Sequence, residues 1–320
     1  MMMKAAVYDA PGAPEVLRYE DVPVPALGID QVLIAVEAIS VNQRDLNDRG
    51  LIWPPHPMWI PGTAAAGTVI AAGSYVHNRK VGDRVAAFDN HGSHAALWAV
   101  PVVATWLIPP LVNAADAAAL PAAYGTAYHG LFVRGQLRRG ETLLVQAAWT
   151  EVGLAAVQLA GRAGANVLAV GRGSARCDRI RALGAYHVVD LEVHDVVRDL
   201  LRLTGQRGVD LVFDPSGSSL AISLGVLSED GRLVILSNSV GAPLSVALSS
   251  LGSNRALLVV QTNSVLERST VYLAVDQLFA LLAAKDIRMI LDCTFPLREA
   301  AAAHRYAEAS DPFGSVILTP

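Results

Sequence analysis

The chain has 320 residues, enough for about two domains, and 52% of them are hydrophobic. Charged residues make up 17% of the chain and the formal net charge is -4, so the basic surplus that nucleic-acid binding requires is missing. The best candidate for a membrane span, residues 90–115, is interrupted by prolines and polar residues. The chain begins without the apolar block of a signal peptide, and two cysteines are too few for a four-thiolate zinc site. We therefore expect a cytoplasmic protein with no nucleic-acid partner and no membrane partner.

Short strands interrupted by proline and glycine are predicted for the first 110 residues or so. They cover residues 4–8, 31–40, 66–73, 84–88 and 95–101. This pattern indicates an all-β region.

From about Ala114 the pattern changes, because helices of ten or more residues alternate with compact apolar runs. The runs cover residues 142–147, 166–170, 211–214, 232–236 and 256–260. Such alternation predicts an α/β fold with a doubly wound parallel sheet. A helical stretch at 270–285 follows, and the chain closes with an apolar run at 315–319. We expect this tail to rejoin the first domain, because a last strand needs an open sheet edge to pair with.

Short motifs along nearly the whole chain resemble the medium-chain dehydrogenase/reductase superfamily. They include Val81-Gly-Asp-Arg-Val85, Ala118-Ala-Leu-Pro121, Gly208-Val-Asp-Leu-Val-Phe-Asp214, Asp230-Gly-Arg-Leu-Val-Ile-Leu236 and Phe313-Gly314. The resemblance implies a Rossmann-type doubly wound sheet at residues 124–266, which binds a dinucleotide. It also implies a GroES-like, β-rich catalytic domain at residues 1–123, completed by residues 267–320.

Within that superfamily the chain resembles the zinc-independent quinone oxidoreductase and enoyl reductase branch. Asn42 stands where zinc alcohol dehydrogenases carry their first ligand cysteine, and the structural-zinc lobe is missing. We therefore expect no metal, and we interpret His91 and His94 as solvated loop histidines rather than ligands. The candidate catalytic residues that the resemblance implies are Asn42, Asp45, Thr126 and Tyr128, with Tyr128 the nearest candidate for a proton donor.

The turn after the strand at 142–147 is where the pyrophosphate of a dinucleotide normally meets helix N-terminal amides. The branch usually has Ala-x-Gly-Gly-Val-Gly there, whereas this chain has Ala148, Trp149, Thr150, Glu151, Val152 and Gly153. Thr150 brings a Cβ, and Glu151 brings a carboxylate, to the path of a diphosphate. Two interpretations stay open: a plain helix start with Thr150 as N-cap, or weakened dinucleotide affinity.

The loop after the next strand carries Arg172 and Arg176, which fit the 2′-phosphate of NADPH in related enzymes. No acidic residue that would select NAD ends the strand at 166–170. We therefore expect NADPH as the cofactor, bound by the 148–153 turn, the two arginines and Ser237.

The resemblance implies reduction of an activated C=C bond in a quinone, enone or enoyl thioester, with a small hydrophobic molecule as substrate. The altered 148–153 turn supports an alternative, in which the protein is a non-redox cyclase of a secondary-metabolite intermediate or a binding protein. We also expect a homodimer, because the apolar strand at 256–260 would otherwise leave a sheet edge open.

Overall fold

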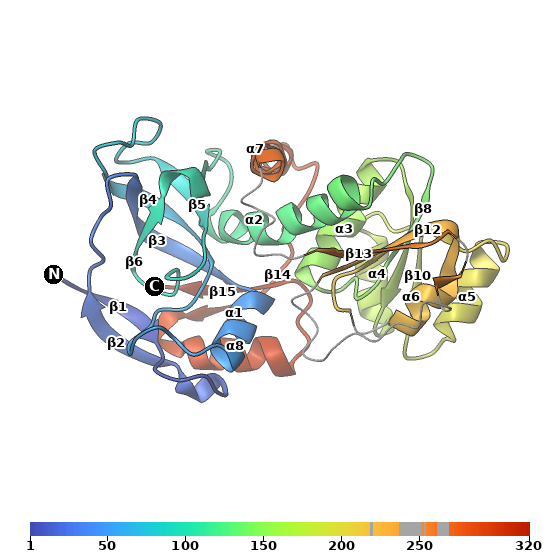
Figure 1. Ribbon diagram of the computed structural model, residues 1–320, viewed down its shortest axis with the longest axis horizontal. Helices are drawn as coiled ribbons and strands as arrows, with labels where there is room; N and C mark the ends of the chain where they lie inside the picture. The colour runs from blue at the N-terminus through green and yellow to red at the C-terminus, as the bar shows by residue number, and fades with distance from the viewer. Residues whose placement is uncertain (218–219, 237–250, 253, 261–268) are drawn as a thin grey trace. The chain divides into compact units, whose positions relative to one another are not determined.

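The computed structural model describes residues 1–217, 220–236, 251–252, 254–260 and 269–320 (Figure 1). The chain divides into two compact units. Unit 1 comprises Met1–Ala122 and Tyr272–Pro320, and unit 2 comprises Ala123–Val271. Two helices cross the boundaries between the units, α2 (Ala114–Tyr128) and α7 (Ser269–Ala283).

Unit 1 is built on β-strands, with two helices between them in the chain. The strands are β1 (Met2–Val7), β2 (Arg18–Pro23), β3 (Gln31–Val41), β4 (Ala64–Ala72), β5 (Arg84–Phe88), β6 (Leu97–Pro101), β7 (Thr105–Leu107), β14 (Leu291–Pro296) and β15 (Ser315–Thr319). The helices are α1 (Gln43–Leu51) and α8 (Ala300–Ala309), with single 3-10 turns η1 (Pro14–Val16), η2 (Val102–Ala104) and η7 (Leu297–Glu299). A seven-stranded sheet has the order β14-β15-β3-β4-β5-β7, with β6 also paired to β3, and β1 pairs with β2 separately.

The long strand β3 organises the core of unit 1. Val32, Ile34 and Val36 alternate along it and are buried, as a period of two requires for one face of a sheet. The C-terminal strand β15 pairs antiparallel with β3, with Ile317 opposite Ser40, so the tail does rejoin the first part of the chain. The expected all-β region is wrong in one place, since α1 lies between β3 and β4.

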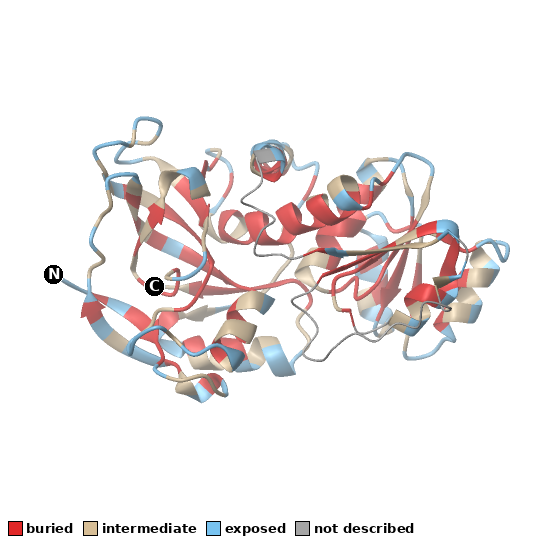
Figure 2. Cartoon of the chain, viewed as in Figure 1, coloured by how far each residue is buried: buried red, intermediate tan, exposed pale blue. Residues whose placement is uncertain are grey.

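Unit 2 is a parallel sheet with the strand order β10-β9-β8-β11-β12-β13. The strands are β8 (Thr142–Val145), β9 (Asn166–Gly171), β10 (His187–Asp190), β11 (Val209–Asp214), β12 (Leu227–Leu236) and β13 (Ala256–Val260). The helices are α3 (Glu151–Arg162), α4 (Ser174–Arg181), α5 (Val196–Leu203) and α6 (Leu220–Val226), and a π-helical turn, η3 (His129–Arg134), precedes β8. Figure 2 shows the strands of this sheet as largely buried. The expected α/β, doubly wound fold is confirmed.

The chain order within this sheet determines where a ligand site is expected. From β8 the chain steps outward through β9 to β10, and then returns to the other side of β8 at β11. The order therefore reverses between β8 and β11. In open parallel sheets, ligands bind outside the carboxyl ends of the strands at such a reversal.

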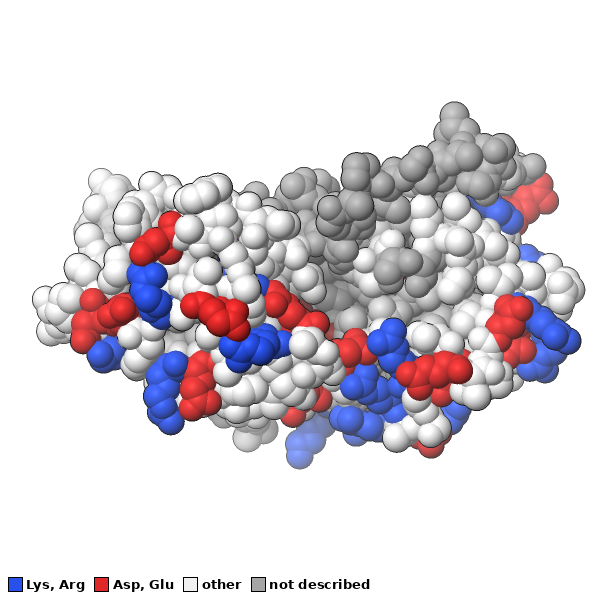
Figure 3. Space-filling view, turned by 90° about the horizontal axis from the view of Figure 1, so that it is seen from below, with Lys and Arg blue, Asp and Glu red and all other residues white. Residues whose placement is uncertain are grey.

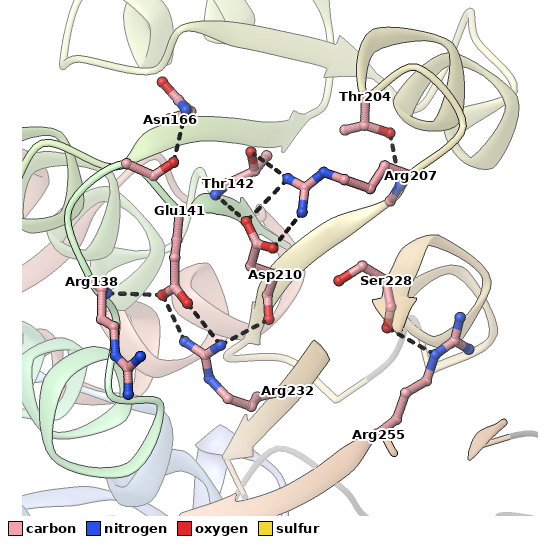
Figure 4. Close-up of polar contacts among 12 residues, drawn as sticks. Arg138, Glu141, Thr142, Asn166, Thr204, Arg207, Asp210, Ser228, Arg232 and Arg255 are labelled. Atoms are coloured by element: carbon pink, nitrogen blue, oxygen red, sulfur yellow. Dashed lines mark hydrogen bonds and ion pairs between the residues drawn. The ribbon is translucent and has the colours of Figure 1, made fainter. Parts of the chain in front are cut away.

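The opposite, amino-terminal edge of the same sheet is closed by ion pairs (Figure 4). Arg232 donates to both carboxylate oxygens of Glu141, at 2.8 and 3.1 Å, and to the carbonyl of Gly135. Arg207 pairs with Asp210 at 2.6 Å, and Asp210 also accepts from the backbone N–H of Thr142. These contacts join β8, β11 and β12 at their amino-terminal ends.

On the face of the molecule shown in Figure 3, acidic and basic side chains are interspersed.

Candidate functional site

The turn between β8 and α3 has the backbone of a capped helix start. Thr150 is the N-cap of α3: its hydroxyl accepts from the N–H of Gly153 at 3.2 Å and donates to the carbonyl of Ala147 at 2.9 Å. Gly153 is required by space, because a Cβ there would lie 2.5 Å from the Ala147 carbonyl oxygen. Ala147 adopts a left-handed φ of 44°, which turns the chain sharply before the helix. The N-cap interpretation of Thr150 is therefore confirmed as a structural statement.

This geometry changes what the turn offers to a diphosphate. The N–H of Gly153 already has a side-chain acceptor, so one helix amide is engaged by Thr150. Glu151 and Val152 are half-buried on the first turn of α3, and Ala148 is buried before it. A carboxylate at Glu151 suits the positive end of the helix dipole but opposes a phosphate placed there.

The loop between β9 and α4 is held from the neighbouring strand. Asp190, at the end of β10, accepts from the backbone N–H groups of Gly173 and Glu192, each at 3.0 Å. Gly173 has a left-handed φ of 77°, which lets the loop turn into α4. Arg172 is exposed in this loop, and Arg176 is half-buried on the first turn of α4.

Two features of this loop were not anticipated. The guanidinium carbon of Arg172 lies 5.2 Å from the centre of the Trp149 ring, so the two adjacent turns touch through a cation–π contact. Glu192 packs toward Gly173, with its carboxylate 3.7 Å from the position of a Cβ there, so an acidic side chain from the turn after β10 reaches the arginine loop. Only the pairing of β9 with β10 shows this, because Glu192 is 20 residues beyond Arg172 in the chain. Ser237 lies outside the described residues.

In unit 1 the candidate residues Asn42 and Asp45 form one buried hydrogen-bonded cluster with Thr63. The amide of Asn42 donates to the Thr63 hydroxyl at 2.8 Å, and that hydroxyl donates to Asp45 at 2.8 Å. The other carboxylate oxygen of Asp45 accepts from the backbone N–H of Asn42 at 3.0 Å, which completes a capping box at the start of α1. Thr63 was not among the predicted residues, although it directly follows the Pro61-Gly62 motif.

Burial dominates the electrostatics of this cluster. The side chain of Asp45 is 1% exposed, and desolvation raises its pKa to about 7 against the opposing effect of its hydrogen bonds. Asp48, one turn further along α1, pairs with Arg44 at 3.3 Å, and burial raises its pKa as well. The cluster fixes the Asn42 amide, since its oxygen caps the N–H of Arg44 while its nitrogen donates to Thr63.

The other two candidate residues lie in unit 2. Thr126 is buried in α2, and Tyr128, two residues further on, is half-buried with its ring centre 5.3 Å from that of Phe132. The predicted catalytic set is therefore divided, with Asn42 and Asp45 in one unit and Thr126 and Tyr128 in the other.

The interpretation of His94 as a solvated loop residue is wrong. Its side chain is fully buried, and its Nε2 lies 3.0 Å from Nε2 of His304 on α8. Backbone hydrogen bonds to Pro61 and Ala6 draw this segment into unit 1. His91 is exposed and packs on Trp59, with ring centres 4.2 Å apart. Across the described ranges, no group of three or more His, Cys, Asp or Glu side chains could hold a metal ion.

Comparison with known proteins gives a consistent result. Residues 152–282 match the family described as zinc-binding dehydrogenase, and residues 28–100 match the alcohol dehydrogenase GroES-like domain. The human synaptic vesicle membrane protein VAT-1 homolog is 33% identical, with 92% of this chain and 80% of that protein covered. A quinone oxidoreductase of Pseudomonas aeruginosa is 31% identical, with 100% of both chains covered. A mycobacterial protein solved in complex with NADPH has a TM-score of 0.91 at 28% identity, covering 99% of this chain and 100% of that one.

The parallel sheet, the GroES-like strands and these similarities define an oxidoreductase of the dehydrogenase type. The chain belongs to the medium-chain dehydrogenase/reductase superfamily, in its quinone oxidoreductase and enoyl reductase-like group. The resemblance in its motifs is thereby confirmed, and a nicotinamide cofactor is the one that this family implies. Among the helices that the structure describes, none is both long and apolar enough to cross a membrane.

Proposed function

We propose that this protein is an NADPH-dependent reductase that works without zinc and reduces an activated C=C bond in a quinone, enone or enoyl thioester. The observation that carries the proposal is the pair of arginines at the carboxyl edge of β9. Arg172 and Arg176 offer cationic donors to a 2′-phosphate, on the side of the sheet reversal where a dinucleotide is expected. A relative named quinone oxidoreductase and a structural neighbour solved with NADPH support the same assignment.

The residues fit a dinucleotide better at its adenosine end than at its pyrophosphate end. Gly153 keeps α3 close against the turn after β8, which lets a ligand approach the helix start. Arg172 and Arg176 would hold the 2′-phosphate. At the pyrophosphate, Thr150 engages one amide and Glu151 adds a negative charge, so we expect the affinity to be lower than an all-glycine turn would give.

The Asn42 cluster supplies a site for the substrate carbonyl that needs no metal. A bound reduced nicotinamide supplies the hydride, which is added to one carbon of the activated bond. One N–H of the Asn42 amide is held by Thr63, and we assign the other to the substrate oxygen, whose negative charge grows as the hydride arrives. A hydroxyl then provides the balancing proton, and Tyr128 is the candidate donor that the family resemblance implies.

The test is consumption of NADPH with para-benzoquinone, a simple enone and crotonyl thioester as acceptors. Asn42→Ser keeps a side chain able to cap α1 but removes the amide, and we expect kcat/KM to fall at least about tenfold. Asn78→Ala, at an exposed position of unit 1, is the matched control and should leave kcat/KM unchanged. Absence of NADPH consumption with all three acceptors would reject the proposed function. Equal rates in Asn42→Ser and the parent would reject only the role of Asn42.

One observation favours the second candidate, a non-redox cyclase or binding protein: the amide of Gly153 is already engaged by the Thr150 hydroxyl. In that case no nucleotide would bind at micromolar concentration. Titration of the purified protein with NADPH by calorimetry separates the two candidates, because only the reductase gives a saturable heat.

A further inference from the structure

Trp149, at the variable position of the 148–153 turn, contacts the neighbouring loop that carries Arg172. β8 and β9 are neighbouring parallel strands, with Val145 opposite Ala169, so the turns that follow them emerge side by side. The N–H of Ala148 donates to the carbonyl of Val170 at 3.1 Å, which ties the first turn to the end of β9. The backbone on both sides of the contact is therefore fixed by the sheet.

The indole itself is held rather than solvated. Trp149 is only 8% exposed although it lies in a turn, whereas Arg172 is exposed. The guanidinium carbon of Arg172 is 5.2 Å from the centre of the Trp149 ring, within the range of a cation–π interaction. A guanidinium placed over an aromatic face keeps its N–H groups at its edges, where they can donate in parallel to phosphate oxygens.

The charges around this stack make orientation matter. Asp190 holds the backbone of Gly173, directly after Arg172, and the exposed carboxylate of Glu192 packs toward the same glycine. A carboxylate this close to the loop competes with a 2′-phosphate for the guanidinium groups of the loop. The indole contact ties Arg172 to the turn that follows β8.

We propose that Trp149 is a positioning residue that orients Arg172 for a 2′-phosphate, so the residue at the variable position of the 148–153 turn contributes to selection of NADPH over NADH. The proposal rests on the proposed function for its choice of ligand. It assigns to Trp149 a role opposite to simple obstruction: loss of the indole should weaken binding of the 2′-phosphate while leaving the rest of the adenosine end unaffected.

Two fragments of the cofactor, which lack the nicotinamide half and are not turned over, test the contact between Trp149 and Arg172. Calorimetry with adenosine 2′,5′-bisphosphate and with 5′-AMP measures the affinity ratio that the 2′-phosphate contributes. In Trp149→Leu we expect that ratio to fall about fivefold, whereas Trp149→Phe, which keeps an aromatic face, retains most of it. Arg179→Ala removes an exposed positive charge from α4 and controls for the loss of nearby positive charge as such. It should leave the affinity ratio unchanged.

Arg172→Lys gives an independent test at an exposed position. It keeps the charge but loses the planar group that stacks, so we expect a drop like that of Trp149→Leu, and no further drop when both changes are combined. An unchanged ratio in both Trp149→Leu and Arg172→Lys would overturn the proposal. So would tighter binding of both fragments in Trp149→Leu, which would show that the indole obstructs the site. Since neither fragment is turned over, these outcomes are separate from failure of the reductase activity.

Discussion

His94 and His304 form a buried neutral pair in unit 1 that no part of the proposed chemistry uses. Burial lowers the pKa of His94 to about 3, and burial together with the neighbouring His94 and the positive charge of Arg49 lowers the pKa of His304 well below its ordinary value. Asp45 behaves in the opposite sense, because burial raises its carboxyl pKa to about 7. These three groups link the stability of unit 1 to pH.

We expect the unfolding free energy of unit 1 to fall as the pH is lowered from about 6.5 to about 4.5. Toward the lower end of that window, the two histidines carry about two protons in the unfolded chain that they lack in the folded chain. Asp45 carries one proton in the folded chain that it lacks in the unfolded chain, so these three groups give a net difference of about one proton. The slope should be about 1.4 kcal/mol per pH unit. Urea unfolding followed by tryptophan fluorescence measures it, since four of the five tryptophans, Trp53, Trp59, Trp98 and Trp106, lie in unit 1.

His304→Leu is the matching variant, since it removes one titrating histidine and should bring the slope close to zero. The absolute stability of this variant is expected to be lower, and the comparison rests on the slopes alone. A parent protein whose unit 1 is equally stable across the window would contradict this account, because the folded chain would then bind as many protons as the unfolded chain.

At the level of single residues, sequence reasoning identified side chains but not their partners. Asn42 and Asp45 were recognised as a motif, but Thr63, which joins their side chains, lies 18 residues beyond Asp45, directly before β4. His94 was misjudged because its burial depends on His304, which is 210 residues away in the chain. Such long-range packing leaves no periodic signal near the residue itself.

At the scale of the elements, substitutions in the β8–α3 turn give the most direct test of its effect on NADPH affinity. Replacing Trp149 by Ala, Thr150 by Gly and Glu151 by Gly removes one carboxylate and two larger side chains, and it frees the amide of Gly153. We expect calorimetry to show NADPH binding at least about tenfold tighter, or ~1.4 kcal/mol, because the lost charge repulsion outweighs the lost support of Arg172. Unchanged affinity in the triple variant would mean that the turn already accommodates a diphosphate.

Thr150→Ala alone should lower the free energy of unfolding by about 1 kcal/mol, because α3 loses its N-cap.

The strands were predictable because a period of two and short apolar runs are strong local signals. The runs predicted at 84–88, 256–260 and 315–319 coincide with β5, β13 and β15. α1 was missed because Asn42-x-x-Asp45 was interpreted only as a family motif, although the same spacing is a capping box. β10 was also not predicted as a strand.

At the scale of the whole molecule, the edge of the unit 2 sheet indicates self-association. β13 is the last strand in the order that the structure describes, and Val259 on it is 53% exposed. We expect a homodimer through this edge, with a mass by light scattering of about twice 33.7 kDa. Val259→Lys should shift the mass toward the monomer. A parent mass of 33.7 kDa at micromolar concentration would contradict this expectation.

The central claim, that the protein is an NADPH-dependent enzyme, is tested most directly by thermal unfolding with NADPH and with NADH. At ~100 times the dissociation constant, a ligand stabilises the native state by ~2.7 kcal/mol, which gives a clear rise in Tm. The account predicts a larger rise with NADPH than with NADH, and an equal rise with both in the double variant Arg172→Ala, Arg176→Ala. No rise with either nucleotide, or equal rises in the parent protein, would contradict it.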